Sequence, residues 1–202
     1  MKKFKVTVSG ISPLLQARHP SPNELAKMVL RMKKNGTVGK KMTNLDADEQ
    51  FKIHSYKTKS NKFFQPSEMI EAAMVKAATS FRMEGKKTYK DAFKAGLFVD
   101  PAQIVHKYQK FTKDERWAKN PSTRGAIWVV RPCIDKWELS FFINLLLDER
   151  IPEEVIREVL SYAGSFVGIG AWRPKHGRFE IKSFEEVSQT KKKKVVKKNK
   201  KN

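Results

Sequence analysis

Hydrophobic and polar residues alternate near both ends of the chain, which is the pattern of half-buried β-strands. Phe4, Val6 and Val8 alternate with polar residues close to the N-terminus. Residues 178–184 repeat this pattern near the C-terminus. Because successive side chains of a strand point to opposite faces, each segment predicts a strand with one face in a core.

Two apolar runs in the last third of the chain predict a β-hairpin. The first run covers residues 126–133 and the second covers 138–147. Asp135 and Lys136 lie between them and favour a tight turn. A shorter apolar run at 97–99, just before Asp100 and Pro101, is compatible with one more short strand.

Helical periodicity indicates two helices with one apolar face each. The first is predicted at 68–82, with Ser67 as its N-cap and Gly85 beyond its end. The second opens at Pro152 and carries acidic residues in its first turn. The predicted apolar faces are Ile70, Met74, Ala77, Ala78 and Phe81 in the first helix, and Val155, Ile156, Val159, Leu160 and Ala163 in the second.

These elements follow one another as strand, helix, strand, strand, helix, strand. The order predicts an α+β fold of the ferredoxin-like (RRM-like) βαββαβ type, an antiparallel sheet with two helices and two long insertions. The insertions are expected at about residues 16–65 and 86–124, which are basic and lack sustained periodicity. The first contains a predicted helix at 22–32 and a basic turn at 33–41. We expect a single domain over 1–188 and a disordered Lys-rich tail over 189–202.

The charge of the chain points to the kind of partner it binds. The chain has 42 Lys and Arg against 21 Asp and Glu, which is a formal net charge of +21. The last twelve residues hold eight lysines and no acid, so 21 − 8 leaves +13 on the preceding 190 residues. The body is therefore basic in its own right. Self-repulsion of this size favours a polyanionic partner. We expect RNA or single-stranded DNA, and a membrane surface only as a weaker alternative, since no basic amphipathic helix stands out.

Cysteine content and hydropathy restrict the compartment. Cys133 is the single cysteine, so neither an intrachain disulfide nor a Cys-based zinc site can form within one chain. No apolar run approaches the ~20 residues that span a bilayer, and the N-terminus lacks the apolar region of a signal peptide. The sequence predicts a soluble, cytoplasmic protein without a membrane partner, located in the host cytoplasm if the chain is virus-encoded.

A glycine-rich basic stretch between the second helix and the last strand is the best candidate for a binding site. Glycines let a backbone approach a phosphate, cations supply charge, and a tryptophan can stack on a base. The alternative is a glycine C-cap followed by an ordinary turn, with the tryptophan packed on the core. Given the body charge, we favour binding. The predicted nucleic-acid-binding residues are Gly168, Gly170, Trp172, Arg173, Lys175, His176, Gly177 and Arg178 in this stretch, with Arg131, Lys40, Lys41 and Lys62 elsewhere.

Basic residues are also interleaved with aromatic residues at 57–64 and 107–119. This mixture suits single strands, because phosphates attract cations and unpaired bases stack on flat rings. The alternative is that the aromatic side chains anchor the insertions to the core. Arg131 and Trp128 lie on a predicted strand and are expected to face the ligand side of the sheet.

Two of these segments resemble motifs of the RAMP superfamily, the CRISPR-associated repeat-associated mysterious proteins. The Gly168-Ile169-Gly170 segment, followed by a basic stretch and Gly177, resembles the superfamily's glycine-rich loop. Residues 63–73 (FFQPSEMIEAA) are similar to the place where backbone subunits carry an aromatic-x-Pro-x-Ser segment before the first helix. The resemblance implies a ferredoxin-like domain that binds guide RNA in a ribonucleoprotein, with a homo-oligomer along the strand left open.

Candidate catalytic residues are few. The four histidines show no metal-ligand spacing, so we expect no metal, no other cofactor and no small-molecule substrate. His54 or His176 could act as a general base in metal-independent RNA cleavage, although a histidine that only contacts a phosphate is the favoured interpretation. Asp46 begins an acidic island, and some backbone subunits of the superfamily cut target RNA with an aspartate in a comparable loop. A solvated loop or a local salt bridge is favoured there.

We therefore expect a nucleic-acid-binding protein that is not an enzyme. Two other functions are kept as alternatives: a metal-independent endoribonuclease of the same superfamily, and a virus-encoded structural or assembly protein that binds nucleic acid incidentally.

Overall fold

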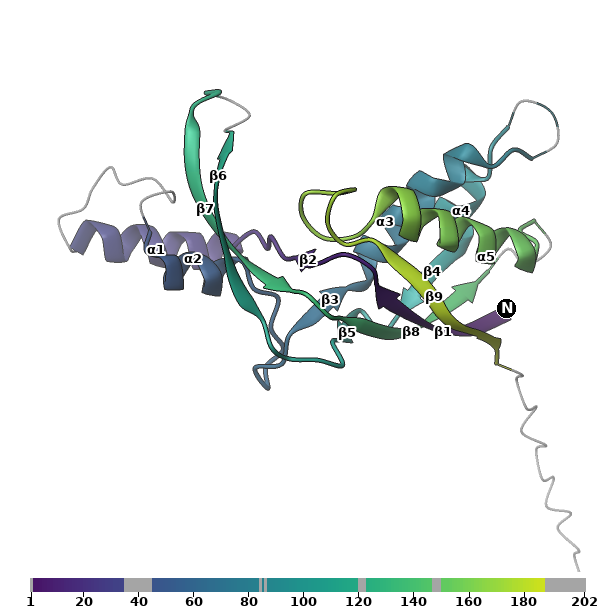
Figure 1. The fold of residues 1–202 in the computed structure, drawn as a ribbon, viewed down its shortest axis with the longest axis horizontal. Helices are drawn as coiled ribbons and strands as arrows, with labels where there is room; N and C mark the ends of the chain where they lie inside the picture. The colour runs from purple at the N-terminus through teal and green to yellow at the C-terminus, as the bar shows by residue number, and fades with distance from the viewer. Residues whose placement is uncertain are drawn as a thin grey trace, which may run out of the picture.

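The structure, a computed structural model, describes residues 2–34, 45–83, 85, 87–119, 123–146 and 150–187. The predicted lysine tail and the predicted binding residues Lys40 and Lys41 lie outside the described residues. The molecule is elongated, with a helix-covered sheet at one end and a long β-ribbon with two helices at the other (Figure 1). In the described part of the chain, none of the helices is long and apolar enough to cross a membrane.

A four-stranded antiparallel sheet forms the centre of the helix-covered end, with the strand order β4-β8-β1-β9. The predicted strands near the two termini pair with each other, with Phe4 opposite Glu186. The short strand at Leu97 is also present and pairs with Leu145. The general α+β class with antiparallel sheets is thereby confirmed. The bounds are β1 (Lys2–Gly10), β4 (Leu97–Asp100), β8 (Glu138–Leu145) and β9 (Phe179–Glu186).

Three helices cover one face of this sheet (Figure 1). They are α3 (Ser67–Ala77), α4 (Lys90–Gly96) and α5 (Glu153–Tyr162), with short helical extensions η2 (Ala78–Ser80) and η3 (Ala163–Val167). The predicted apolar faces of α3 and α5 meet the inward side chains of β1 in one core. Ser67 was expected as the N-cap of α3, but Pro66 holds that position and Ser67 is the first, buried residue of the helix.

The predicted hairpin between residues 126–133 and 138–147 is wrong. Strand β7 (Ala126–Ile134) pairs with β6 (Thr112–Lys119) and with β2 (Leu14–Leu15), whereas β8 pairs with β1 and β4. The stretch 86–124, interpreted as an insertion, thus supplies β4 to the main sheet and β6 to the ribbon. Arg131 consequently lies on the β2-β7-β6 sheet, and not on a face of the main sheet as expected.

The other end of the molecule is built around the β6-β7 ribbon (Figure 1). Helix α1 (Pro22–Lys34) confirms the predicted helix at 22–32, and α2 (Ala47–His54) packs on β7. Strands β3 (Phe64–Pro66) and β5 (Gln103–Val105) form a small third sheet. Gln16 joins these parts: its fully buried side chain donates to the Phe64 carbonyl (2.8 Å) and accepts from the Tyr56 amide (2.9 Å).

On the face of the main sheet away from the helices, several charged and aromatic groups contact one another. The Lys3 ammonium lies 4.3 Å from the centre of the Phe142 ring. Glu138 accepts hydrogen bonds from Lys107 (2.7 Å) and Lys182 (2.8 Å). These contacts cover part of the Phe142 ring and pair two of the lysines near this face with Glu138.

Candidate nucleic-acid interface

The glycine-rich loop 168–178 connects η3 to β9 and lies between the ribbon and the helices (Figure 1). Its backbone is hydrogen-bonded to Pro13 and to Leu15 of β2, the strand that pairs with β7. The Ala171 amide donates to the Leu15 carbonyl (2.8 Å), and the Gly177 amide donates to the Pro13 carbonyl (2.8 Å). Such bonds hold the loop in one conformation against β2.

Close packing explains why the loop needs glycine. Gly170 has a φ of +79° and Gly177 has a φ of +73°, in the left-handed region that other residues adopt at a cost. A Cβ atom on Gly170 would collide with the Leu15 carbonyl, and one on Gly177 would collide with the Ile169 carbonyl. The turn alternative therefore accounts for these glycines, including Gly168 against the His176 carbonyl. A phosphate-cradling role for the three glycines stays a prediction.

Trp172 is the centre of a cluster that joins the loop to the ribbon. The guanidinium carbon of Arg116, on β6, lies 4.4 Å from the centre of its ring, and that of Arg131, on β7, lies 5.1 Å away. The His176 ring lies 6.3 Å from the Trp172 ring, centre to centre. The structure thus brings together three of the predicted binding residues, Arg131, Trp172 and His176, and adds Arg116.

The two arginines of this cluster differ in their access to a carboxylate. Arg116 binds Asp114 through Nε and Nη2, and this pairing raises the pKa of Arg116. Arg131 has buried Nε and Nη1 atoms with no hydrogen-bond partner among the described residues. Burial lowers the pKa of Arg131, Asp114 opposes this effect, and the charge of Arg116 lowers the pKa further. Asp114 therefore balances Arg116 and leaves Arg131 unmatched.

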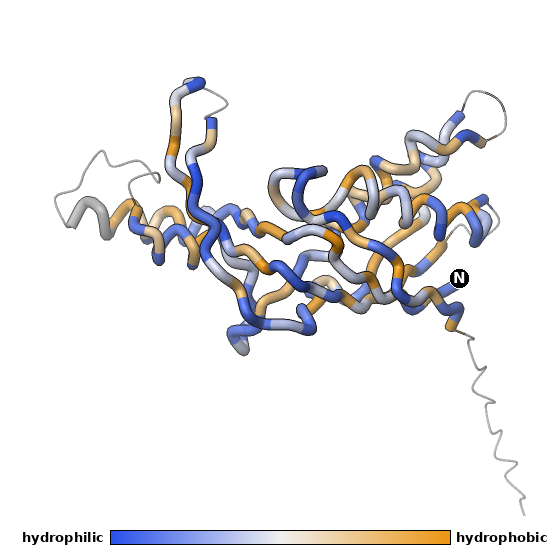
Figure 2. Tube along the Cα trace, in the orientation of Figure 1, coloured by the Kyte–Doolittle hydropathy of each residue, from blue (hydrophilic) through white to orange (hydrophobic). Residues whose placement is uncertain are grey.

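The loop also carries three exposed cations and no acid between residues 168 and 178. Arg173, Lys175 and Arg178 take part in none of the ion pairs found in the described part of the chain. The Arg178 Nε donates to the Pro174 carbonyl (2.8 Å), which orients this side chain along the loop. Figure 2 shows the hydrophilic apex of the loop facing the ribbon, whose β6 strand is also hydrophilic.

The predicted binding residue Lys62 is placed differently. It follows an exposed turn, in which its amide donates to the Thr58 hydroxyl (3.1 Å). No contact of the described residues brings Lys62 into the Trp172 cluster. Its role in binding stays a prediction.

His54 and His176, the candidate general bases, are both partly withdrawn from solvent. His54 Nδ1 lies 2.7 Å from the Val130 carbonyl and donates to it, and burial lowers the pKa of His54 despite this bond. His176 is buried, with no hydrogen-bond partner for either ring nitrogen among the described residues. Burial also lowers the pKa of His176. In both residues burial thus favours the neutral ring.

The acidic island serves local structure. Asp46 is the N-cap of α2 and accepts a hydrogen bond from the Glu49 amide (2.7 Å). Asp48 forms an ion pair with Lys113 of β6 (3.0 Å). These contacts fit the salt-bridge alternative and fix α2 against the ribbon. Within the described ranges, no group of three or more His, Cys, Asp or Glu side chains is placed to hold a metal ion.

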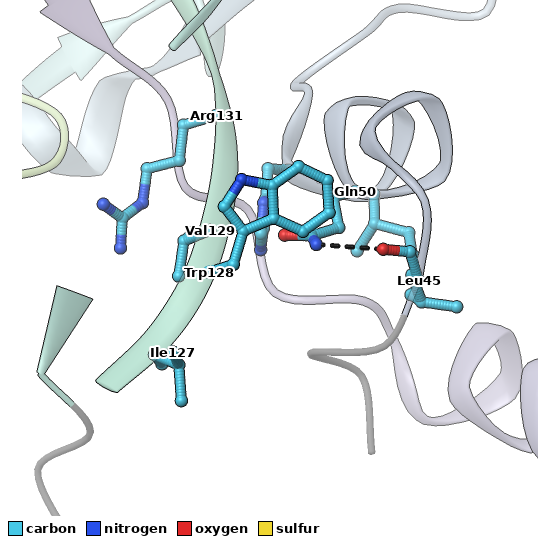
Figure 3. A pocket seen from close by; sticks show the side chains of 8 residues that line it. Leu45, Gln50, Ile127, Trp128, Val129 and Arg131 are labelled. Carbon is cyan, nitrogen blue, oxygen red and sulfur yellow. Dashed lines mark hydrogen bonds between the residues drawn. The ribbon is translucent and has the colours of Figure 1, made fainter. Parts of the chain in front are cut away.

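A cleft of about 200 Å³ lies between α2 and the ribbon (Figure 3). Gln50 forms part of its wall, accepting from the Val130 amide (3.0 Å) and donating to the Leu45 carbonyl (3.1 Å). Trp128 and Arg131 leave β7 in different directions in this view. The lining residues are Leu45, Gln50, Ile53, His54, Ile127, Trp128, Val129 and Arg131.

Sequence reasoning missed Asp114, and it named Arg116 only as one of the basic residues interleaved with aromatic residues at 107–119. The signal was present as an alternation in β6, where Asp114, Arg116 and Ala118 share the less exposed face of the strand. Because this face is polar, the alternation lacks the hydrophobic contrast by which strands are recognised.

Comparisons with known proteins agree at the level of the fold. No protein-family model matches the sequence, and no curated protein matches it. The fold is similar to that of a chain in the solved structure described as "Cryo-EM structure of the Type III-B Cmr-beta bound to cognate target RNA". The TM-score is 0.54 at 11% sequence identity, over 93% of this chain and 61% of that chain. The present chain thus spans less than two thirds of the chain it matches, and the likeness is one of fold.

Proposed function

We propose that this chain binds RNA, or single-stranded nucleic acid generally, along the phosphate backbone, as a RAMP-type subunit of a cytoplasmic ribonucleoprotein. The observation that carries the proposal is the loop 168–178. It is fixed against β2, it presents Arg173, Lys175 and Arg178 without acidic partners among the described residues, and it meets two ribbon arginines at Trp172. A rigid array of cations is the chemistry that a phosphate backbone requires.

The topology supports a ferredoxin-like core within this proposal. Helix α3 connects β1 to β4 and α5 connects β8 to β9, and the sheet order β4-β8-β1-β9 places the first and third strands of that series at the centre. This order supports the proposed split βαβ arrangement. The similar solved structure is of a Cmr-beta bound to target RNA, which favours RNA over DNA as the partner.

Exposed aromatic surface on the ribbon supports a single-stranded ligand. Trp117 on β6 is 70% exposed and lies opposite Trp128 of β7. An exposed indole beside cations can stack on an unpaired base whatever its identity. The proposed mode is therefore backbone contact at the loop and stacking at the ribbon, without sequence readout.

We propose binding without cleavage. The His54 Nδ1–H donates a hydrogen bond to the Val130 carbonyl, and Asp46 is the N-cap of α2. Both contacts favour structural roles for these residues. A gel assay of labelled RNA incubated with the protein in the absence of metal tests this part, because clean cleavage that is lost in His54→Ala or His176→Ala would contradict it.

The experiment that tests binding is a salt titration of affinity, followed by fluorescence anisotropy of a labelled RNA of about 20 nucleotides. If about six phosphates are neutralised, log affinity falls with log salt at a slope near −4. The variant Arg173→Gln/Lys175→Gln/Arg178→Gln should make this slope less negative by about 2, since each lost contact removes about 0.7. A salt-independent affinity would overturn the proposal.

The matched control removes three exposed cations from the helix-covered end of the molecule. Lys76, Lys90 and Lys94 are exposed on α3 and α4. Their replacement by Gln changes the net charge equally, so we expect almost no change of slope. An equal loss in both triple variants would show that only the total charge matters and that the loop has no specific role. The same oligonucleotide as DNA separates RNA from single-stranded DNA.

A further inference from the structure

Trp172 is held in a strained position over polar groups. Its φ of +56° lies in the left-handed region, which costs a residue with a Cβ about 1–2 kcal/mol. It is one of three residues other than glycine with a positive φ in the described part of the chain. Strain of this kind persists only where surrounding contacts hold it, and it is concentrated at functional sites.

The groups that Trp172 covers lack the partners that they need. Arg131 keeps two buried nitrogens and His176 keeps both ring nitrogens without a hydrogen bond among the described residues. Only four residues of the described chain have such orphaned side-chain atoms, and two of them contact Trp172. A π-face satisfies a guanidinium only in part, whereas a phosphate would supply full charge and hydrogen-bond acceptors.

The local charge favours an anion at this place. Five cations lie on the loop and on the facing ribbon: Arg173, Lys175 and Arg178 on the loop, with Arg116 and Arg131 on the ribbon. The one carboxylate bound in the cluster, that of Asp114, pairs with Arg116. A planar guanidinium matches the oxygens of a phosphate, which an ammonium group does not.

We propose that Trp172 covers a phosphate seat formed by Arg131 and His176, and that a phosphate of the bound strand takes the place of the indole ring. The indole leaves its strained position, and one phosphate becomes fixed at Arg131 while its neighbours lie along the exposed loop cations. The displaced ring is then free to stack on a base. The inference rests on the proposed function only for the source of the phosphate.

The seat is tested first with inorganic phosphate alone, observed through the ¹⁵N-labelled backbone amide resonances of Ala171 and Gly177, which the wild type and every variant retain. Saturable shifts are expected in the wild type, and they should disappear in Arg131→Lys, which keeps the charge but loses the planar group. Trp172→Gly relieves the strain and uncovers the seat, so it should bind phosphate at least about threefold more tightly. Phe166→Gly, at an exposed aromatic position of η3 outside the cluster, should bind as the wild type does.

The second arm uses the labelled RNA. Arg131→Lys should weaken binding about tenfold and leave the salt slope unchanged, because a charge-assisted hydrogen bond is lost while the charge remains. The matched control is Arg157→Lys on the exposed face of α5, which should be neutral. Thermal unfolding of each variant shows that the comparison is made on folded protein.

The outcomes separate the seat from the proposed function. Wild-type affinity for RNA in Arg131→Lys, or phosphate binding no tighter in Trp172→Gly than in the wild type, overturns the seat and leaves backbone binding by the loop intact. Phosphate binding that depends on Arg131, in a protein that binds no RNA, supports the seat and overturns the proposed function.

Discussion

His106 makes the stability of the fold depend on pH. The residue is 2% exposed, neither ring nitrogen has a hydrogen-bond partner among the described residues, and its ring packs edge-on against Phe111 (5.2 Å between centres). Burial lowers its pKa from 6.5 to about 4. The folded protein therefore keeps His106 neutral where the unfolded chain already binds a proton.

The sign and size of the effect follow from this difference in pKa. Protonation of the unfolded chain begins near pH 6.5, so the free energy of unfolding decreases as the pH falls from there and levels off near pH 4. The full difference, 6.5 − 4, corresponds to about 3 kcal/mol, and about 2 kcal/mol of it is lost at about pH 5.

Urea unfolding at about pH 7.5 and about pH 5 measures this loss. In His106→Leu, which is apolar and of similar size, the loss between the two pH values should be smaller by about 2 kcal/mol. His54 and His176 also have lowered pKa values and remain in both proteins, so their contributions cancel in the comparison. An equal loss in the variant and the wild type would refute the reasoning.

Three further changes test individual contacts. Gly177→Ala forces a Cβ atom into a carbonyl at a positive φ, so it should lower the melting temperature and the free energy of unfolding, the latter by at least about 2 kcal/mol. In the control Gly125→Ala the Cβ atom would lie 3.6 Å from its nearest neighbour, so this variant should be nearly neutral. Gln50→Leu leaves a buried amide of β7 without its acceptor and should cost about 2 kcal/mol in urea unfolding. Asp114→Asn removes the carboxylate that balances Arg116 and should tighten RNA binding severalfold by anisotropy; unchanged or weaker binding would place the cluster outside the interface.

The sequence predicted elements well where one face of the element is apolar. The alternation at Phe4, Val6 and Val8 and the helical stripe around Ile70 both report burial, and burial is what hydrophobic patterns encode. The partner of each strand was not predictable in this way. The apolar run at 126–133 looks the same whether it pairs with β8 or with the polar strand β6, because pairing depends on contacts far apart in the chain.

For the candidate site, the sequence predicted the loop but not its contacts with the ribbon. Glycines and cations marked the loop, because a left-handed turn and an unmatched charge leave traces in composition. Trp172, His176 and Arg131 were each predicted as binding residues, but the sequence did not show that they meet. The arginines of the cluster come from β6 and β7, more than forty positions from Trp172, and their approach depends on how the loop docks on the ribbon.

The short segment from Pro13 to Arg18 contacts both ends of the molecule. Pro13 and Leu15 accept the loop's hydrogen bonds, while Gln16 is bonded to Tyr56, Phe64 and the backbone of β7. The segment thus links the basic loop to the far end of the molecule through hydrogen bonds on both sides. Because the same few residues bond to both parts, one short segment sets the position of the loop relative to the ribbon.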